Sequence, residues 1–190
     1  MAELVFHYGV MGGGKTTALI LDEYNNTARG KHCIIIKPAI DTRHGKIKGW
    51  GKIKSRVLKS EHQALYIDKV VPDEYKLFNI VYADEIQFFT EDDIYALSEI
   101  VDKYNITVYC YGLKTDSAGE LFKASAKLLA IADRCIELPL LCKCGKPATH
   151  HIRYINGKIA ENQAGIMVEK GKVEYKSLCR SCWKEMLGKL

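Results

Sequence analysis

The stretch Gly9–Thr16, which reads GVMGGGKT, decides the fold because it matches the pattern G-x-x-x-x-G-K-[ST] without a gap. In this pattern the glycines let backbone N–H groups surround phosphate oxygens, the lysine reaches the terminal phosphates, and the hydroxyl residue ligates Mg²⁺. An apolar run, Leu4–Tyr8, precedes the motif, and a helical stretch, Thr16–Ala28, follows it. A strand, a phosphate loop and a helix in this order predict a nucleotide-binding α/β domain.

Beyond this motif, short apolar runs alternate with helical stretches as far as residue 138. The runs are 33–36, 80–83, 107–111 and 135–138, and the helical stretches are 90–104 and 121–132. Thr90 is placed to cap the first of these helices, whose apolar residues follow at spacings of three and four. The pattern predicts a parallel sheet with helices on both faces. The segment 42–60, rich in Gly, Lys and Arg, is expected to contain a mobile loop.

Composition and charge limit the functions that the chain can have. The 190 residues are 47% hydrophobic and 27% charged, which excludes wholesale disorder. The net charge of +5 suits a phosphate-bearing ligand but is too small to indicate nucleic-acid binding. No apolar run approaches the roughly 20 residues of a membrane span, and no signal-peptide pattern opens the sequence. We therefore expect a cytoplasmic protein with no membrane or nucleic-acid partner.

Two close cysteine pairs late in the chain indicate a metal site. The chain has seven cysteines, an odd number, so these pairs favour a tetrahedral zinc site over a disulfide framework. All-thiolate coordination leaves no open position for water, so the zinc is expected to be structural, with His150 or His151 as substitutes for a cysteine. We predict a P-loop domain over 1–138 and a zinc-ribbon/lasso domain over 139–190. The predicted ligands are Cys142, Cys144, Cys179 and Cys182.

The end of the third apolar run supplies the acids that a phosphate loop needs. Asp84 is predicted to hold Mg²⁺ beside Thr16. Glu85 would polarise a water molecule in an ATPase, or accept the proton of an attacking hydroxyl in a kinase. Arg43 would neutralise transferring phosphate and Asp41 would join the Mg²⁺ shell, although a surface salt bridge explains this pair equally well. The sequence lacks an Asn-Lys-x-Asp motif, which disfavours a GTPase.

Further motifs follow the phosphate loop in a fixed order: Asp-Thr-Arg at 41–43, DEIQFF at 84–89, Gly-Leu at 112–113, and the late cysteine pairs. Together they resemble the compact, zinc-containing thymidine kinases of bacteria and animals. The resemblance implies transfer of the γ-phosphate of ATP to the 5′-hydroxyl of deoxythymidine. It also implies a RecA-like fold and a zinc-anchored lasso that closes over the nucleoside. Such kinases are typically homotetramers that thymidine triphosphate inhibits.

The resemblance also implies roles for individual residues. Glu85 would be the general base, and the lasso backbone from Gly165 to Tyr175 would read the thymine. The implied ATP- and Mg²⁺-binding residues are Gly9, Val10, Met11, Gly12, Gly13, Gly14, Lys15, Thr16, Asp41, Arg43, Asp84 and Gln87. The implied nucleoside-binding residues are Met11, Phe88, Leu113, His151 and Tyr175.

Four departures distinguish this chain from the family pattern. Val10, Gly12 and Gly13 replace the proline, aromatic residue and serine that are usual in the phosphate loop, which bears on nucleotide binding. The element 112–122 lacks the usual aromatic residue and arginine, His151 stands where a threonine often faces the thymine, and Lys170-Gly171 replaces the Gly-Gly of the lasso. Together the departures bear on strict thymidine selectivity more than on kinase activity.

Two other classes of function remain open on the sequence. A P-loop ATPase that couples hydrolysis to nucleic-acid or protein remodelling would use Glu85 to activate water and would need an arginine from a neighbour. A non-enzymatic zinc-ribbon binding module would leave the complete phosphate loop unexplained.

Overall fold

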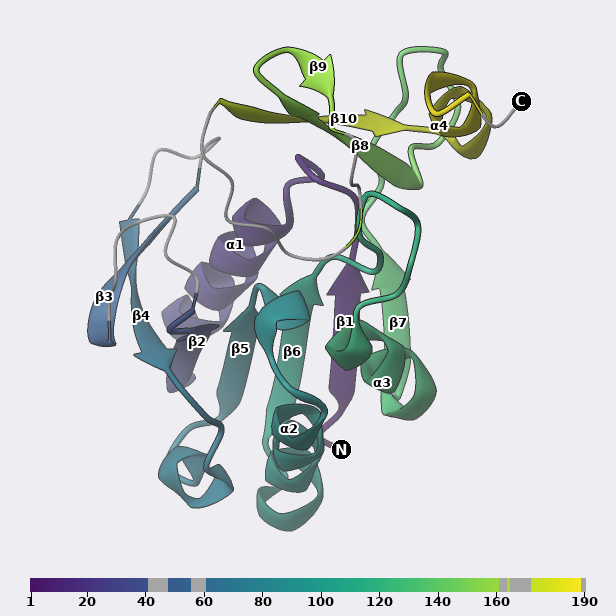
Figure 1. The fold of residues 1–190 in the computed structure, drawn as a ribbon. Coiled ribbons are helices and arrows are strands. Elements are labelled where there is room, and N and C mark those ends of the chain that lie inside the picture. Colours follow the sequence, from purple (N-terminus) through teal and green to yellow (C-terminus); the bar gives the residue numbers. More distant parts are fainter. Residues whose placement is uncertain (41–47, 56–60, 161–163, 165–171, 189–190) are drawn as a thin grey trace.

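A computed structural model describes residues 1–40, 48–55, 61–160, 164 and 172–188. Within this part of the chain, seven strands form a large sheet: β1 Leu4–Tyr8, β2 Cys33–Pro38, β3 Gly49–Lys54, β4 Glu61–Ile67, β5 Ile80–Asp84, β6 Thr107–Gly112 and β7 Arg134–Glu137. Their order across the sheet is β3-β4-β2-β5-β6-β1-β7 (Figure 1). Neighbouring strands run parallel except β3 and β4, which are antiparallel.

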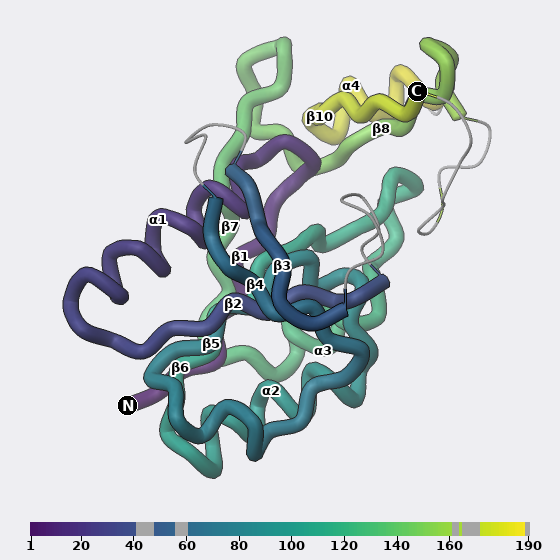
Figure 2. The backbone as a smooth tube through the Cα atoms, turned by 90° about the vertical axis from the view of Figure 1, so that its left-hand side faces the viewer, coloured from purple at the N-terminus to yellow at the C-terminus, as the bar shows by residue number. Residues whose placement is uncertain are grey.

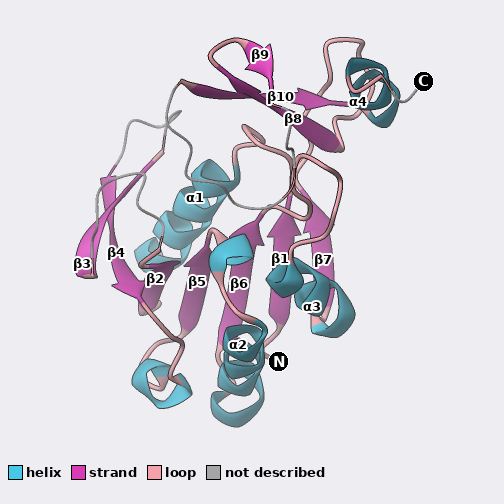
Figure 3. Cartoon of the chain, in the orientation of Figure 1, coloured by secondary structure: helices cyan, strands magenta, loops and turns pink. Residues whose placement is uncertain are grey.

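Helices cover both faces of this sheet, as Figure 3 shows. The helical elements are α1 Lys15–Ala28, α2 Glu91–Tyr104 and α3 Lys123–Ile131, with short 3₁₀ turns η1 Pro72–Tyr75 and η2 Ile86–Phe88. On one face, Leu19 of α1 belongs to a buried cluster with Tyr82. On the other face, Leu97 of α2 and Leu128 of α3 pack in a cluster with Val81. The predicted parallel sheet with helices on both faces is confirmed.

The local sequence explains where α2 begins and ends. Thr90 Oγ1 accepts a hydrogen bond from the Asp93 N–H at 3.1 Å, and Asp93 Oδ2 accepts one from the Thr90 N–H at 3.0 Å. This reciprocal capping box satisfies two backbone donors at the helix N-terminus. At the other end, Asn105 has a φ of 53° and ends the helix in the left-handed conformation. The cap predicted at Thr90 is confirmed.

The edge strands β3 and β4 are not among the strands that the sequence predicts. Residues 49–54, inside the segment expected to contain a mobile loop, form β3 and pair with β4, while residues 42–47 and 56–60 of that segment lie outside the described residues. Ile53, 2% exposed, anchors β3 to the core beside Ala64 and Tyr66 of β4. The strand signal is weak because Ile53 is the one large apolar side chain that β3 buries, while Trp50 and two lysines take its exposed positions.

The chain beyond residue 138 builds a second, antiparallel sheet in the order β10-β8-β9. Its elements are β8 His150–Ile155, β9 Lys158–Ile159, β10 Val173–Leu178 and the following helix α4 Arg180–Met186. Trp183 of α4 packs with Ile152 and Tyr154, and its Nε1 donates to the Ser117 carbonyl at 3.1 Å. Figures 1 and 2 show this sheet beyond the carboxyl ends of the large sheet's central strands, where ligands bind in α/β folds. The division into domains at 138/139 stays a prediction.

Among the helices that the structure describes, none is long and apolar enough to cross a membrane.

Candidate active site and metal centre

The phosphate loop joins the carboxyl end of β1 to the first turn of α1. Its backbone turns at Gly12 and Gly14, whose φ angles of 76° and 73° lie in the left-handed region that glycine adopts without strain. The Gly13 N–H donates to the Val10 carbonyl at 3.1 Å, and Lys15 Nζ donates to the same carbonyl at 2.8 Å. The predicted residues therefore form a compact loop at a helix N-terminus, the arrangement that binds phosphate.

The carboxyl end of β5 brings a buried acid to the loop. Asp84, 1% exposed, accepts hydrogen bonds through Oδ2 from Thr16 Oγ1 and from Lys37 Nζ, both at 3.3 Å. Burial raises the pKa of Asp84, and the Lys37 ammonium acts against that shift. The register pairs Ile36 of β2 with Ala83 of β5, so the lysine and the acid follow at the same level of the sheet.

Lys37 is a functional candidate that the sequence motifs do not single out. It lies near the end of the strand CIIIKP and its side chain is 3% exposed. Lysine is almost never this buried unless it is paired. The signal that identifies it is a lysine in an otherwise apolar strand, at the same sheet edge as Asp84.

The contact between Thr16 and Asp84 suits Mg²⁺. A hydroxyl and a carboxylate are hard oxygen donors of the kind that Mg²⁺ prefers, and their 3.3 Å contact places both oxygens together beside the loop. Asp41 and Arg43, the other predicted members of this group, lie outside the described residues.

Glu85 follows Asp84 in a turn of unusual backbone geometry. Its φ of 58° and ψ of 45° are left-handed, which is uncommon for a residue with a side chain and is frequent at functional sites. Gln87 Nε2 donates to Glu85 Oε2 at 2.6 Å, and Gln87 Oε1 accepts from the Leu113 N–H at 3.0 Å. Gln87 therefore clamps the Glu85 carboxylate to the chain that follows β6.

Gly112, the last residue of β6, permits this close approach. A Cβ atom here would lie 2.5 Å from Ile86 Cγ2 and 2.7 Å from Gln87 Oε1. A Cβ atom is essentially never found this close to an atom to which it is not bonded, so a side chain at 112 would displace the turn that carries Glu85.

The residues predicted to contact the nucleoside come from both sheets. Leu113 is buried beside Gln87, and Phe88 is half-buried. Met11 lies in the phosphate loop, while Tyr175 of β10 meets the His151 ring edge-on, with ring centroids 5.8 Å apart. The predicted lasso contacts at 165–171 lie outside the described residues.

His151 is the predicted nucleoside contact that the structure marks most clearly. It is 3% exposed, and its Nδ1 is a buried nitrogen with no hydrogen-bond partner in the described part of the chain. Burial lowers the pKa of His151 to about 4, so the imidazole is neutral at pH 7. A buried polar atom without a protein partner is the kind of group that a ligand satisfies. The ring lines a small pocket with Tyr8, Gly9, Val10, Lys114, Thr115, Glu137 and Thr149.

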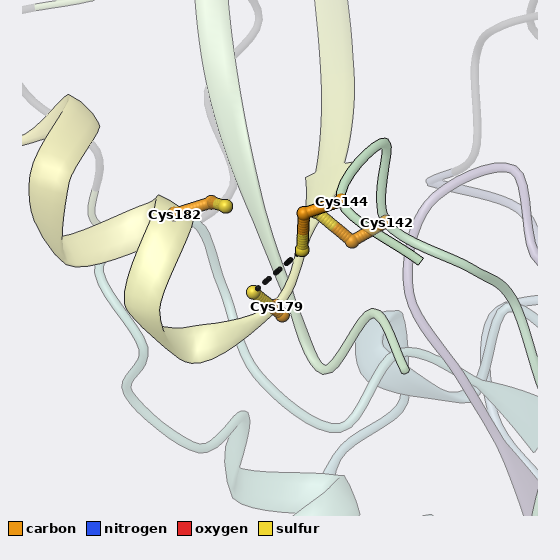
Figure 4. A group of neighbouring side chains, drawn as sticks. All are labelled: Cys142, Cys144, Cys179 and Cys182. Atoms are coloured by element: carbon orange, nitrogen blue, oxygen red, sulfur yellow. Dashed lines mark hydrogen bonds between the residues drawn. The ribbon is translucent and has the colours of Figure 1, made fainter. Parts of the chain in front are cut away.

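The four cysteines predicted to bind zinc come together, as Figure 4 shows. Their sulfur atoms all lie within 4.8 Å of one another, and Sγ of Cys144 is 3.5 Å from Sγ of Cys179. Four sulfurs bound at about 2.3 Å to one tetrahedral zinc are about 3.8 Å apart, so the cluster fits this metal. The four thiols influence one another: hydrogen bonding from the backbone of Cys144 lowers the pKa of Cys142, whereas hydrogen bonding with Cys179 raises the pKa of Cys182.

The two histidines considered as alternative ligands are not part of this cluster. His150 packs against Trp183 with ring centroids 4.6 Å apart, and His151 lines the pocket beside the phosphate loop. The cysteine centre itself packs on that loop, because Val10 forms one buried cluster with Cys142 and Cys179.

Comparison with known proteins identifies the family. The family model for thymidine kinase matches residues 2–183. A thymidine kinase of Shigella dysenteriae serotype 1 (strain Sd197) is 37% identical over 194 aligned residues, which cover 98% of this chain and 93% of that protein. A thymidine kinase of Vibrio vulnificus (strain YJ016) is 37% identical over 196 aligned residues and is matched over 100% of both chains. The solved structure of the replication initiator DnaA bound to AMPPCP and single-stranded DNA aligns with a TM-score of 0.47 and 16% identity, over 73% of this chain and 40% of that chain. On the strength of the family model and the two full-length relatives, this chain belongs to the thymidine kinase family.

Proposed function

We propose that the chain transfers the γ-phosphate of ATP to the 5′-hydroxyl of thymidine. The observation that carries this proposal is the clamped carboxylate of Glu85. Glu85 directly follows Asp84, which contacts Thr16 of the phosphate loop. Gln87 fixes the position of the Glu85 carboxylate through a hydrogen bond. A fixed base next to a phosphate site is what a nucleoside kinase needs, and the family supports thymidine as the acceptor.

On the donor side, each residue has a role that follows from its chemistry. The N–H groups of the phosphate loop and the Lys15 ammonium would bind the phosphates of ATP. Thr16 and Asp84 would hold Mg²⁺, which neutralises charge on the phosphates when it is bound. Gln87 keeps Glu85 oriented, and Glu85 would accept the proton of the 5′-hydroxyl as the new O–P bond forms. Asp41 would join the oxygen atoms around Mg²⁺, and Arg43 would neutralise negative charge on the phosphate that is transferred.

On the acceptor side, the proposed contacts to the nucleoside are apolar and aromatic groups around one buried imidazole. The Leu113 N–H is hydrogen-bonded to Gln87, the residue that holds Glu85. The next two residues, Lys114 and Thr115, line the pocket of His151. A nucleoside with its hydroxyl at Glu85 would therefore direct its base toward His151. The proposed contact residues are Met11, Phe88, Leu113, His151 and Tyr175.

Further properties of the family belong to the same proposal. Zinc held by the four cysteines would be structural, since four thiolates leave no position for a reacting water. We also propose that the protein is a cytoplasmic homotetramer, that thymidine triphosphate inhibits it, and that residues 1–138 and 139–190 form separate domains.

The test is a nucleoside panel with ATP·Mg²⁺, scored for 5′-monophosphate product. We expect thymidine to be phosphorylated and ATP turnover to be slow until thymidine is added. Rapid ATP hydrolysis without any nucleoside, and no monophosphate with any of them, would contradict the proposal and favour a P-loop ATPase.

A further inference from the structure

One short hydrogen bond joins the phosphate loop to the second sheet. Ser177 Oγ, on β10, donates to the Met11 carbonyl at 2.5 Å, and the two residues are 166 positions apart in the chain. Neither the sequence motifs nor the roles proposed above involve Ser177.

This bond fixes the orientation of one peptide plane in the loop. In a trans peptide, the carbonyl oxygen and the N–H of the following residue point to opposite sides. Because Ser177 holds the Met11 oxygen toward β10, the Gly12 N–H points away from the second sheet. N–H groups of such loops are the donors that surround phosphate oxygens, so the direction of this N–H matters for nucleotide binding.

The same peptide plane would turn easily without an anchor. Gly12 has a φ of 76°, and a Cβ built on it would find no atom of the described residues within 4 Å. Glycine populates positive and negative φ about equally, so nothing at residue 12 itself prevents the plane from flipping and presenting a carbonyl to the phosphate. Lys15 Nζ already holds the carbonyls of Gly9 and Val10, which leaves the Met11 carbonyl to Ser177.

Ser177 is itself on a well-anchored strand. It pairs with His151 in the β10–β8 register and stands two residues before Cys179. Cys179 and Cys142 form a buried cluster with Val10, the loop residue next to Met11. The second sheet therefore contacts the loop through a packed side chain and a hydrogen bond at adjacent positions.

We propose that Ser177 is a positioning residue of the phosphate loop: its hydroxyl holds the Met11 carbonyl outward and keeps the Gly12 N–H available to the nucleotide phosphates. The inference rests on the proposed function in assuming that ATP binds at this loop. If Ser177 has this role, the second sheet helps to position the phosphate loop, in addition to the part in nucleoside binding that is proposed for this sheet.

The test measures ADP binding in the presence of Mg²⁺ by calorimetry, on the full-length, zinc-containing protein. Loss of a single hydrogen bond predicts that Ser177→Ala weakens ADP binding about fivefold. The matched control is Ser98→Ala, because the Ser98 hydroxyl also donates to a backbone carbonyl, that of Tyr95 at 2.8 Å, but on the surface of α2. We expect this control to bind ADP like the wild type, and the zinc content of both variants to be unchanged.

A second pair of variants separates the effect of the hydroxyl group from the effect of side-chain size and shape. Ser177→Thr keeps the donor and should bind ADP within about twofold of the wild type, whereas Ser177→Val, which has the shape of the threonine variant but no hydroxyl, should behave like Ser177→Ala. In steady-state assays the KM for ATP should rise in the alanine and valine variants, while the KM for thymidine stays unchanged.

The outcomes distinguish this inference from the proposed function. Wild-type ADP affinity in both the alanine and valine variants, or an equal loss in Ser98→Ala, would overturn the role of Ser177 and leave thymidine phosphorylation untouched. Weaker ADP binding in Ser177→Ala, in a protein that phosphorylates no nucleoside, would support the role of Ser177 and contradict the proposed function.

Discussion

At the scale of single residues, the clearest prediction concerns the proposed base. Glu85→Gln keeps the size of the side chain and a partner for Gln87, but it cannot accept a proton. We expect kcat to fall roughly 100-fold or more, with ADP affinity unchanged, in assays that measure both. Glu99→Gln, which alters an exposed acid paired with Lys103 on α2, is the control and should leave kcat unchanged. A near-normal kcat in Glu85→Gln would remove Glu85 from the mechanism.

A second prediction concerns the buried pair of Lys37 and Asp84. Lys37→Met leaves a buried carboxylate without its cation, which typically lowers the free energy of unfolding by about 3–5 kcal/mol. In urea titrations, the double variant Lys37→Met/Asp84→Asn should lose less stability than the sum of the two single variants, because it removes both charges. Lys52→Met, at an exposed ion pair with Glu61, is the control and should cost much less stability than Lys37→Met, because solvent screens the pair. Additive losses in the double variant would show that the pair is not coupled.

At the scale of elements, the close approach of β6 to the η2 turn can be tested through Gly112. The methyl group of Gly112→Ala would overlap Ile86 and Gln87, so the turn must shift and carry Glu85 with it. Displacement of a catalytic group by about 1 Å predicts a fall in kcat of roughly 100-fold, with ADP binding retained. Gly30→Ala is the control. Its φ of 79° also strains a side chain, but a Cβ there would have no atom of the described chain within 4 Å, so the strain arises far from the site. A normal kcat in Gly112→Ala would mean that the turn adapts without moving Glu85.

The elements also show what the sequence could and could not predict. The central parallel strands were predictable to within about two residues, because each is an apolar run and the phosphate loop sets their direction. The antiparallel pair of β3 and β4 was not, since β3 buries a single large apolar side chain, Ile53, and a single buried position gives no periodic signal. In the site, the phosphate loop, the two acids and the cysteines carry their own motifs. Lys37 and Ser177 do not, because their roles depend on strand register and on contact between the two sheets.

At the scale of the whole molecule, the cysteine centre is expected to hold the second sheet together. Four thiolates in a closed site predict about one zinc per chain by elemental analysis. Cys179→Ser should release the metal and increase hydrogen exchange across β8, β10 and α4, while the large sheet keeps its protection. Cys135→Ser, at an exposed cysteine of β7 outside the cluster, should keep both metal and protection. A metal-free native protein with full activity would contradict the zinc assignment.

Two histidines make the stability of the whole molecule depend on pH. Burial lowers the pKa of His151 to about 4, and burial also lowers the pKa of His7, whose ring stacks on Tyr111. In the unfolded chain the pKa of both side chains is about 6.5, so below that pH the unfolded state binds more protons than the folded state. Their contribution to stability is therefore complete above pH 6.5 and declines as the pH falls toward 4.

Variants that remove these groups should flatten this decline. For His151 the shift predicts that about 2 kcal/mol is lost between pH 7 and pH 5, measured as the free energy of unfolding in urea. His151→Asn, which keeps an amide near the Nδ1 position, should lose less stability over this range than the wild type, and so should His7→Phe, which keeps the ring stack. His32→Gln, at an exposed position, is the control and should follow the wild-type curve. If His151→Asn declines as steeply as the wild type, the pKa of His151 is not lowered in the fold, and burial does not disfavour its charged form as the structure implies.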